Sequence, residues 1–226
     1  MSKPKFLEVA MSLTDVAGVA GMGFVLLALV INVVYARIGL PMPTSGKNLE
    51  EVTDAFATLG KALRAPSTLA PAAWVLTTLF AAGLVSALWG EGAETAGWAL
   101  VGFAGVLMQN ATFTAVEALR FGLASAAARD RGSVAGLWAL NNVLFGFNQA
   151  FLGIAVLGFT VAGAGAGFIA GWHVWLGYLS AGFLFASAAV TPYNAEGTGR
   201  LGLLGLVGWL GWAAWIVAYG VALLGA

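Results

Sequence analysis

Apolar residues run along this chain in long, nearly unbroken stretches separated by short polar segments. A helix needs about 20 apolar residues to cross the roughly 30 Å hydrocarbon core of a bilayer. About six stretches reach that length. They cover about residues 17–36, 68–89, 96–122, 134–162, 167–190 and 201–224. Backbone N–H and C=O groups in the bilayer core must be hydrogen-bonded within the protein, which is possible in helices and in closed β-barrels. The alternation of apolar and polar residues that is typical of barrel strands is missing from these stretches. The pattern therefore predicts an all-α, polytopic transmembrane helical bundle of about six spans, in a single domain over residues 1–226.

The longest connection, residues 39–67, has a helical pattern of its own. After a turn-rich stretch that contains Pro41 and Pro43, apolar residues recur at intervals of three and four. These residues are Leu49, Val52, Phe56, Leu59 and Leu63. The spacing predicts a short amphipathic helix at the cytoplasmic interface of the membrane, which either covers the end of the bundle or acts as a regulatory lid.

Composition agrees with a membrane protein and excludes several other classes. Of the 226 residues, 60% are hydrophobic and 9% are charged, and the mean hydropathy is +0.90. A soluble domain carries about a quarter charged residues. Ten Lys and Arg balance ten Asp and Glu without a basic cluster, so we expect no nucleic-acid partner. The chain has no Cys and one His, so we expect no metal and no cofactor.

Positive charges are distributed unevenly over the connections. One side of the predicted bundle has Arg37, Lys47, Lys61, Arg64, Arg120, Arg129, Arg131 and Arg200. The other side has Lys3 and Lys5, which alone would favour the reverse orientation. Cytoplasmic connections carry the excess of Lys and Arg. We therefore expect a multi-pass protein of the cell membrane with both termini on the non-cytoplasmic side.

Two consecutive spans carry polar side chains at membrane depth, where such groups are costly and mark candidate functional sites. In the third span, spacings of four and three put Asn110, Thr114 and Glu117 on one helical face. We expect this face to look into the bundle. Arg120, three residues after Glu117, offers another interpretation, in which the two form an ion pair near the interface.

The fourth span carries four amides at a spacing of seven residues. Asn148 follows Asn141 by seven residues, and Gln149 follows Asn142 by seven residues, so each pair lies on one face of the helix. Because both spans meet the same connection, Glu117 and Asn141 would lie at the same depth, about 10 Å into the membrane. We therefore expect Glu117 to hydrogen-bond to Asn141 or Asn142, beside a polar cavity that opens toward the cytoplasm. The amides alternatively serve only to join the helices.

Aromatic residues and the single histidine are further candidates. Trp212 and Tyr219 share a face of the last span, and Trp209 lies in its inner half. These rings either fill the core or line a pocket for an apolar or cationic ligand. His173, near the outer end of the fifth span, is an interfacial residue unless Asp15 or Glu8 on the same side completes a second site.

Three stretches carry a resemblance to known proteins. They are the segment Trp138-Ala-Leu-Asn-Asn-Val-Leu-Phe-Gly146, the segment that begins Trp172-His173, and the ending around Trp212. Together they resemble a broad bacterial family of uncharacterised six-span integral membrane proteins, which implies the fold but no chemistry. In size and aromatic content the protein is also similar to membrane-embedded terpene and meroterpenoid cyclases of biosynthesis. That similarity implies an isomerase-type reaction on a lipophilic substrate.

We therefore expect one of two functions, and we favour the first. In the first, the protein is a cofactor-independent cyclase or isomerase of a lipophilic, isoprenoid-like small molecule. Glu117 would protonate the substrate, and Asn141 and Asn142 would orient this acid. Substrate would be bound by Asn110, Thr114, Asn148, Gln149, Trp209, Trp212 and Tyr219. In the second, the same polar stripe serves a small transporter or a ligand-binding membrane subunit.

Overall fold

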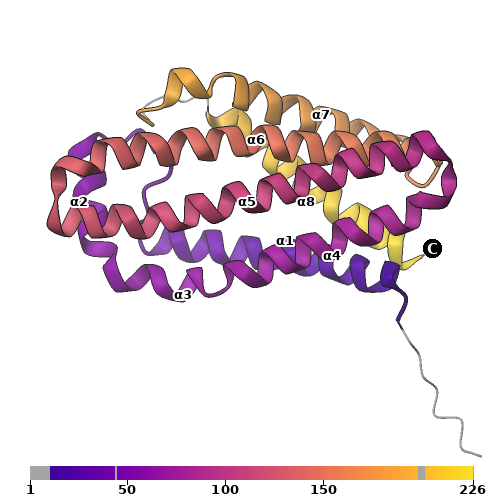
Figure 1. Ribbon diagram of the computed structural model, residues 1–226, viewed down its shortest axis with the longest axis horizontal. Coiled ribbons are helices and arrows are strands. Elements are labelled where there is room, and N and C mark those ends of the chain that lie inside the picture. Colours follow the sequence, from indigo (N-terminus) through magenta and orange to yellow (C-terminus); the bar gives the residue numbers. More distant parts are fainter. Residues whose placement is uncertain (1–10, 44, 198–201, 226) are drawn as a thin grey trace, which may run out of the picture.

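The computed structural model describes residues 11–43, 45–197 and 202–225, and within these ranges its regular structure is helical (Figure 1). The long helices are α1 (Leu13–Arg37), α4 (Ala70–Leu88), α5 (Ala93–Arg129), α6 (Val134–Gly165), α7 (Gly171–Ala189) and α8 (Leu203–Leu224). Two shorter helices, α2 (Leu49–Leu59) and α3 (Arg64–Ser67), lie between α1 and α4. Single 3-10 turns cover Gly60–Leu63, Trp89–Glu91, Arg131–Ser133 and Thr191–Asn194. The all-α prediction is confirmed.

Each predicted span coincides with one long helix. Among the described residues, α1, α4, α5, α6 and α8 are the five helices that are long and apolar enough to cross a membrane. The exception, α7, contains His173, two Trp residues and one Tyr residue. Helix α5 continues past the predicted end at residue 122 to Arg129. Its 37 residues make it about 56 Å long at 1.5 Å per residue, so it is longer than a bilayer core is thick.

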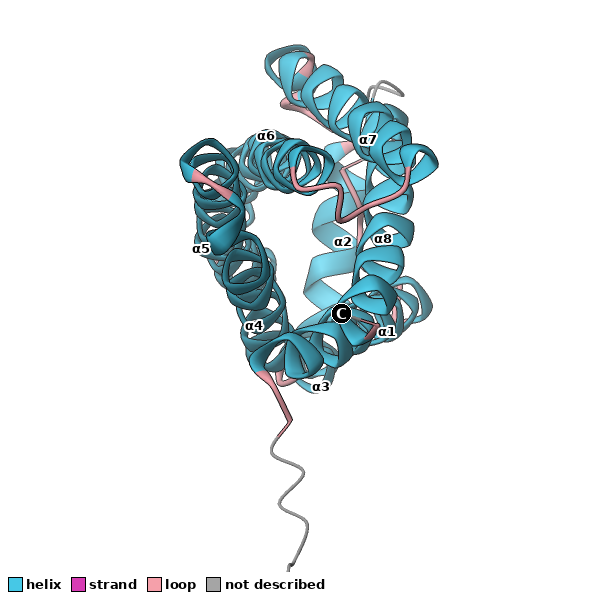
Figure 2. Ribbon diagram, turned by 90° about the vertical axis from the view of Figure 1, so that its right-hand side faces the viewer, coloured by secondary structure: helices cyan, strands magenta, loops and turns pink. Residues whose placement is uncertain are grey.

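The six long helices form a closed ring (Figure 2). Each helix contacts the next one in the sequence, and α8 returns to contact α1. Helices α5 and α6 form the most extensive pair. A Cβ built on Gly105 would lie 2.5 Å from the backbone nitrogen of Ala155, and one built on Gly18 would lie 2.7 Å from the carbonyl oxygen of Gly220. Glycine therefore allows the close backbone approach that holds helices together in lipid.

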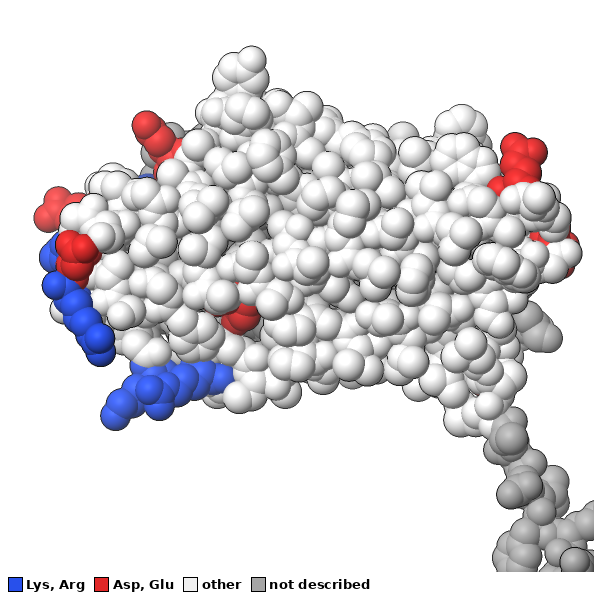
Figure 3. Space-filling model, in the orientation of Figure 1, with Lys and Arg blue, Asp and Glu red and all other residues white. Residues whose placement is uncertain are grey.

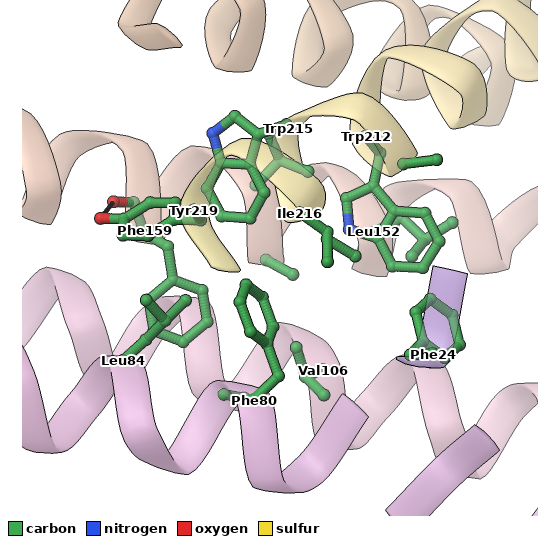
Figure 4. Close-up of a cluster of buried hydrophobic side chains, with 14 of the residues drawn as sticks. Phe24, Phe80, Leu84, Val106, Leu152, Phe159, Trp212, Trp215, Ile216 and Tyr219 are labelled. Carbon is green, nitrogen blue, oxygen red and sulfur yellow. Dashed lines mark hydrogen bonds between the residues drawn. The ribbon is translucent and has the colours of Figure 1, made fainter. Parts of the chain in front are cut away.

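One end of the ring is filled by a packed core (Figure 4). Trp215 and Tyr219 of α8 lie with their ring centroids 4.8 Å apart, and Phe80 of α4 contacts both at 6.4 Å. Phe159 of α6 and Ile216 of α8 complete this layer, each 1% exposed. The interior at this end therefore has its space taken by large side chains.

Helix α2 covers the opposite end of the ring. Its buried side chains Val52, Phe56 and Leu59 pack with Leu123 and Trp138, the latter 6.2 Å from Phe56 between ring centroids. The predicted apolar stripe is confirmed except for Leu49, which is 46% exposed. Figure 3 shows the visible Lys and Arg side chains at this end and only acidic side chains at the other. Lys3, Lys5, Glu8 and Arg200 lie outside the described residues.

The contact between α5 and α6 predicts a sharp difference between two glycines of α5. Gly105→Ala forces the two backbones apart, and we expect it to lower the free energy of unfolding by about 1–3 kcal/mol. Gly122→Ala is the control, because a Cβ there meets nothing within 4 Å. It should leave stability unchanged or raise it by up to about 1 kcal/mol through helix propensity. Thermal unfolding in detergent micelles measures both, and equal losses would contradict the close packing.

Candidate functional site

A cavity of about 270 Å³ lies inside the ring, in the half toward the end that α2 covers. Each of the six long helices contributes to its wall. Its inner limit is formed by Phe24, Leu152 and Trp212, where the packed core begins. The rings of Phe24 and Trp212 meet edge to face at 5.3 Å (Figure 4). The cavity is therefore bounded on the side that faces the packed core.

Aromatic side chains from several helices form part of the cavity wall. The six aromatic residues that line it are Phe24, Trp74, Phe113, Phe145, Trp209 and Trp212. Trp209 and Trp212 were both predicted to line a site, and their ring centroids lie 6.4 Å apart. These rings offer apolar surface and π faces to a bound molecule.

The cavity is also lined by amide side chains, among them Gln109 of α5 and Asn142, Asn148 and Gln149 of α6. Each of these four is at most 7% exposed, and none of their side-chain oxygens has a hydrogen-bond partner among the described residues. The Asn142 amide is oriented by its Nδ2, which donates to the carbonyl oxygen of Ala195 at 3.1 Å. A buried acceptor without a donor costs about 1–3 kcal/mol.

These amides occupy two levels along the hairpin of α5 and α6. Because the backbones of Gly105 and Ala155 are adjacent, Gln109 is level with the turn of α6 that holds Asn148 and Gln149. Glu117 and Asn142 lie at a second level, nearer to α2. The level of Gln109, Asn148 and Gln149, which is the one farther from α2, is also close to α7 and α8. A Cβ on Gly205 of α8 would lie 3.4 Å from Cδ of Gln149 and 2.6 Å from Oγ of Ser187 of α7.

Glu117 lines the cavity, but protein donors already occupy its carboxylate. Its Oε1 accepts hydrogen bonds from the Tyr35 hydroxyl and from Ser67 Oγ, the latter at 2.5 Å. Its Oε2 pairs with Arg120 Nη1 at 2.5 Å. The Arg120 guanidinium is buried and lies 4.5 Å from the centroid of the Tyr35 ring. This buried cluster joins α1 and α3 to α5 and leaves the carboxylate as an acceptor.

The partners of Glu117 therefore differ from the predicted ones. Glu117 and Asn142 both line the cavity, but side chains from α1 and α3 take the bonds that we assigned to Asn141 or Asn142. Asn141 is buried and does not line the cavity, so the predicted role of Asn141 in orienting the acid has no support in this geometry. Its Oδ1 has no partner among the described residues, and nothing in the structure explains that.

Three other predicted residues also lie away from the cavity. Asn110 joins α5 to α4, since its Nδ2 donates to Thr78 Oγ1 at 3.2 Å and its Oδ1 accepts from Thr77 at 3.1 Å. Thr114 is exposed and donates to the carbonyl oxygen of Asn110 in its own helix. Tyr219 belongs to the packed core and donates to the carbonyl oxygen of Phe159 at 3.1 Å. A shared helical face does not ensure a shared environment, because the neighbours of α5 change along its length.

Three residues of the site were not predicted. Gln109 lies on the cavity face of α5, and a spacing of four residues through Phe113 to Glu117 marks that face. Tyr35 and Ser67 are 82 and 50 residues from Glu117 in the sequence. No local pattern connects residues so far apart.

His173 is buried and contacts residues of the packed core. Its Nε2 lies 3.0 Å from the carbonyl oxygen of Trp215, and its ring contacts those of Trp172 and Tyr219. Asp15 forms a capping box with Ser12 at the start of α1. The structure does not bring His173 and Asp15 together as a second site. Within the described residues there is also no group of three or more acidic or His side chains placed to hold a metal.

Comparison with protein families, curated proteins and solved structures finds no similar protein. The two resemblances inferred from the sequence therefore stay predictions.

The Glu117 cluster predicts a large penalty for breaking one buried ion pair. Arg120→Met keeps much of the side-chain volume but leaves the carboxylate without its counter-ion, and we expect a loss of about 3–5 kcal/mol in unfolding free energy. The double variant Glu117→Gln with Arg120→Met should recover much of that loss. Arg131→Met is the matched control, because its 2.6 Å ion pair with Asp54 is more than half exposed. We expect that control to lose at most about 1 kcal/mol, and similar losses for both arginines would refute the assignment.

Proposed function

We propose that this protein is a multi-pass membrane protein that binds a lipophilic small molecule inside its helical ring. The observation that carries the proposal is the cavity, whose wall combines six aromatic side chains with the buried amide side chains of Gln109, Asn142, Asn148 and Gln149. Apolar walls with a few convergent polar groups are typical of small-molecule sites. Amides that served only to join helices would bond to neighbouring helices, as Asn110 does.

The membrane placement is part of the proposal. Helix α7 packs between α6 and α8 in the ring, and we therefore count it as a sixth span. The end near α2 carries Arg37, Lys61, Arg64 and Arg129, and the opposite end carries Glu91 and Glu94. The positive-inside rule then puts the α2 end in the cytoplasm and both termini on the other side of the cell membrane. Helix α2 would lie at the cytoplasmic interface, with Glu50 and Glu51 toward water.

The size of the cavity limits the ligand. Its 270 Å³ is at the low end of the range for small-molecule pockets, about 300–1,000 Å³. A small isoprenoid fits this space, whereas a whole phospholipid does not. The aromatic wall suits an apolar body, and such a molecule reaches the site by partitioning into the bilayer.

The boundary of the cavity favours binding over transport. A transporter exposes one site alternately to both sides of the membrane. Here Trp215, Tyr219 and Phe80 fill the interior beyond Trp212, so passage would require the best-packed layer of the ring to open. A binding protein, or the membrane subunit of a larger assembly, needs no such opening.

Acid-initiated cyclisation or isomerisation is a second candidate. It is favoured by the position of Glu117, which lines the same cavity as Trp209 and Trp212. A carbocation formed there would have π faces beside it. The reaction requires Glu117 to give a proton, whereas Tyr35, Ser67 and Arg120 all donate to it. We rank this candidate second for that reason.

Two neighbouring alanines of α4 provide a test of the binding site. Ala73 lines the cavity inside the ring, whereas Ala72 is exposed on the outer surface of the protein. With geraniol as a small isoprenoid probe, we expect a concentration-dependent rise in Tm for the wild type and for Ala72→Leu in detergent micelles. Ala73→Leu fills part of the cavity and should reduce or abolish the rise. An equal rise in all three proteins would show that geraniol acts outside the cavity.

Product analysis separates the two candidates. The binding proposal predicts that geraniol is recovered unchanged after incubation with the protein in lipid nanodiscs. Cyclised or isomerised product from the wild type that is lost with Glu117→Gln would establish the second candidate. Product that persists in Glu117→Gln would show catalysis without Glu117 as the acid.

A further inference from the structure

Two helices of the ring, α1 and α8, separate beside the cavity. We infer that the cavity opens between them into the cytoplasmic leaflet of the bilayer, and that a long isoprenoid chain binds there with its far end still among the lipid chains. The inference rests on the proposed binding function and extends its ligand class from small isoprenoids to longer ones.

Two residues that line the cavity are also exposed on the outside of the protein. They are Asn32 of α1 and Leu206 of α8, and Leu206 is 51% exposed. The described lining residues of α4, α5, α6 and α7 are buried or partly buried. Among the described residues of the cavity wall, exposure is therefore confined to the two helices that close the ring.

Asn32 and Leu206 lie on the edges that α1 and α8 turn toward each other. Gly18 and Gly220 mark these edges at the other end of the ring, where both glycines are buried in close backbone contact. Asn32 follows Gly18 by fourteen residues, and Leu206 precedes Gly220 by fourteen, which is close to four helical turns. Because the two helices run antiparallel, Asn32 and Leu206 come to the same level on opposite sides of the interface.

Contact between α1 and α8 becomes looser toward the cavity. After the glycine pair, the side chains of Phe24 and Trp212 span the distance between the helices, with ring centroids 5.3 Å apart. At Asn32 and Leu206, the same two edges are exposed instead of buried in each other. The Asn32 Nδ2 donates to the carbonyl oxygen of Ala28 in its own helix at 2.8 Å, so this amide does not tie α1 to α8. The two helices therefore leave an opening at this level.

The surface around the opening is apolar. Its exposed residues are 43% to 52% exposed, namely Leu29 and Val33 of α1 and Leu203, Val207 and Leu210 of α8. Asn32 and Leu206 lie within about 8 Å of the helix ends near α2. In the proposed orientation, this depth corresponds to the outer part of the acyl chains in the cytoplasmic leaflet. The opening therefore connects the cavity with lipid.

An opening into lipid removes the limit that the cavity volume sets on chain length. The 270 Å³ inside the ring takes the first part of an isoprenoid chain. The remainder passes between α1 and α8 and stays in the bilayer, so no additional apolar surface meets water. A closed cavity of the same volume would reject a chain of twenty carbons.

The experiment compares chain lengths in lipid nanodiscs. Geraniol, farnesol and geranylgeraniol carry the same alcohol on ten, fifteen and twenty carbons. Each competes with radiolabelled geraniol, and concentrations are expressed as mole fractions in the lipid, so that differences in partitioning cancel. Leu206→Trp narrows the opening from α8, and Leu210→Trp is its matched control, because Leu210 is 52% exposed but does not line the cavity. Asn32→Trp and Val33→Trp form the corresponding pair on α1.

We expect the wild type to bind geranylgeraniol at least as tightly as geraniol. Leu206→Trp and Asn32→Trp should keep their affinity for geraniol and lose about tenfold or more in affinity for geranylgeraniol, with farnesol between the two. Leu210→Trp and Val33→Trp should keep their affinity for all three alcohols. Retained binding of geraniol also shows that the narrowed variants are folded.

Several outcomes would overturn the inference. Weaker binding of geranylgeraniol than of geraniol to the wild type would indicate a closed cavity and leave the proposed function intact. Unchanged affinity for geranylgeraniol in both narrowed variants, or an equal loss in their controls, would show that the chain does not pass between α1 and α8. If a narrowed variant loses geraniol as well, the comparison of chain lengths in the wild type decides. If radiolabelled geraniol does not bind the wild type, the proposed function fails for isoprenoid alcohols together with the inference.

Discussion

The hydrocarbon core of a bilayer neither donates nor accepts hydrogen bonds. Each polar side chain at that depth must therefore find its partner inside the protein or in enclosed water. In this chain that constraint acts mainly on the hairpin of α5 and α6. Glu117 and Asn110 satisfy it through neighbouring helices. Gln109, Asn148 and Gln149 line the cavity inside the ring, and their side-chain oxygens have no hydrogen-bond partner among the described residues. The candidate site is the space around the groups that the protein leaves unsatisfied.

That space exists because the two ends of the ring are closed in different ways. At one end, glycines bring α1 and α8, and α5 and α6, close enough for Trp215, Tyr219 and Phe80 to fill the interior. At the other end, α2 packs across α5, and the buried cluster of Glu117 ties α1 and α3 to the same helix. Between these closures the helices are separated by side chains that do not fill the gap. The cavity therefore follows from the packing of both ends.

The sequence alone was sufficient to predict the long helices, because long apolar runs have no other stable form in a bilayer. It also predicted that Glu117, Asn142, Asn148 and Gln149 are buried and that Trp209 and Trp212 lie near them. It did not distinguish Asn141 from Asn142, although a rotation of about 100° between consecutive residues puts only one of them in the cavity. The hydrogen-bond donors to Glu117 could not be predicted from the sequence either, because Tyr35 and Ser67 come close to α5 only in the tertiary fold. Helical periodicity gives a face, whereas the identity of the helix opposite that face depends on the assembled ring.

The central claim is that the amides of α6 border an accessible interior space. The natural chain contains no cysteine, so a single introduced thiol reports its own surroundings without interference. Asn148→Cys and Asn141→Cys, reconstituted in lipid nanodiscs, can be compared for their rates of modification by N-ethylmaleimide, a small uncharged reagent. The account predicts that the thiol at position 148 reacts and is protected by a bound probe, while the thiol at position 141 reacts much more slowly. Equal resistance of both thiols to the reagent would contradict it.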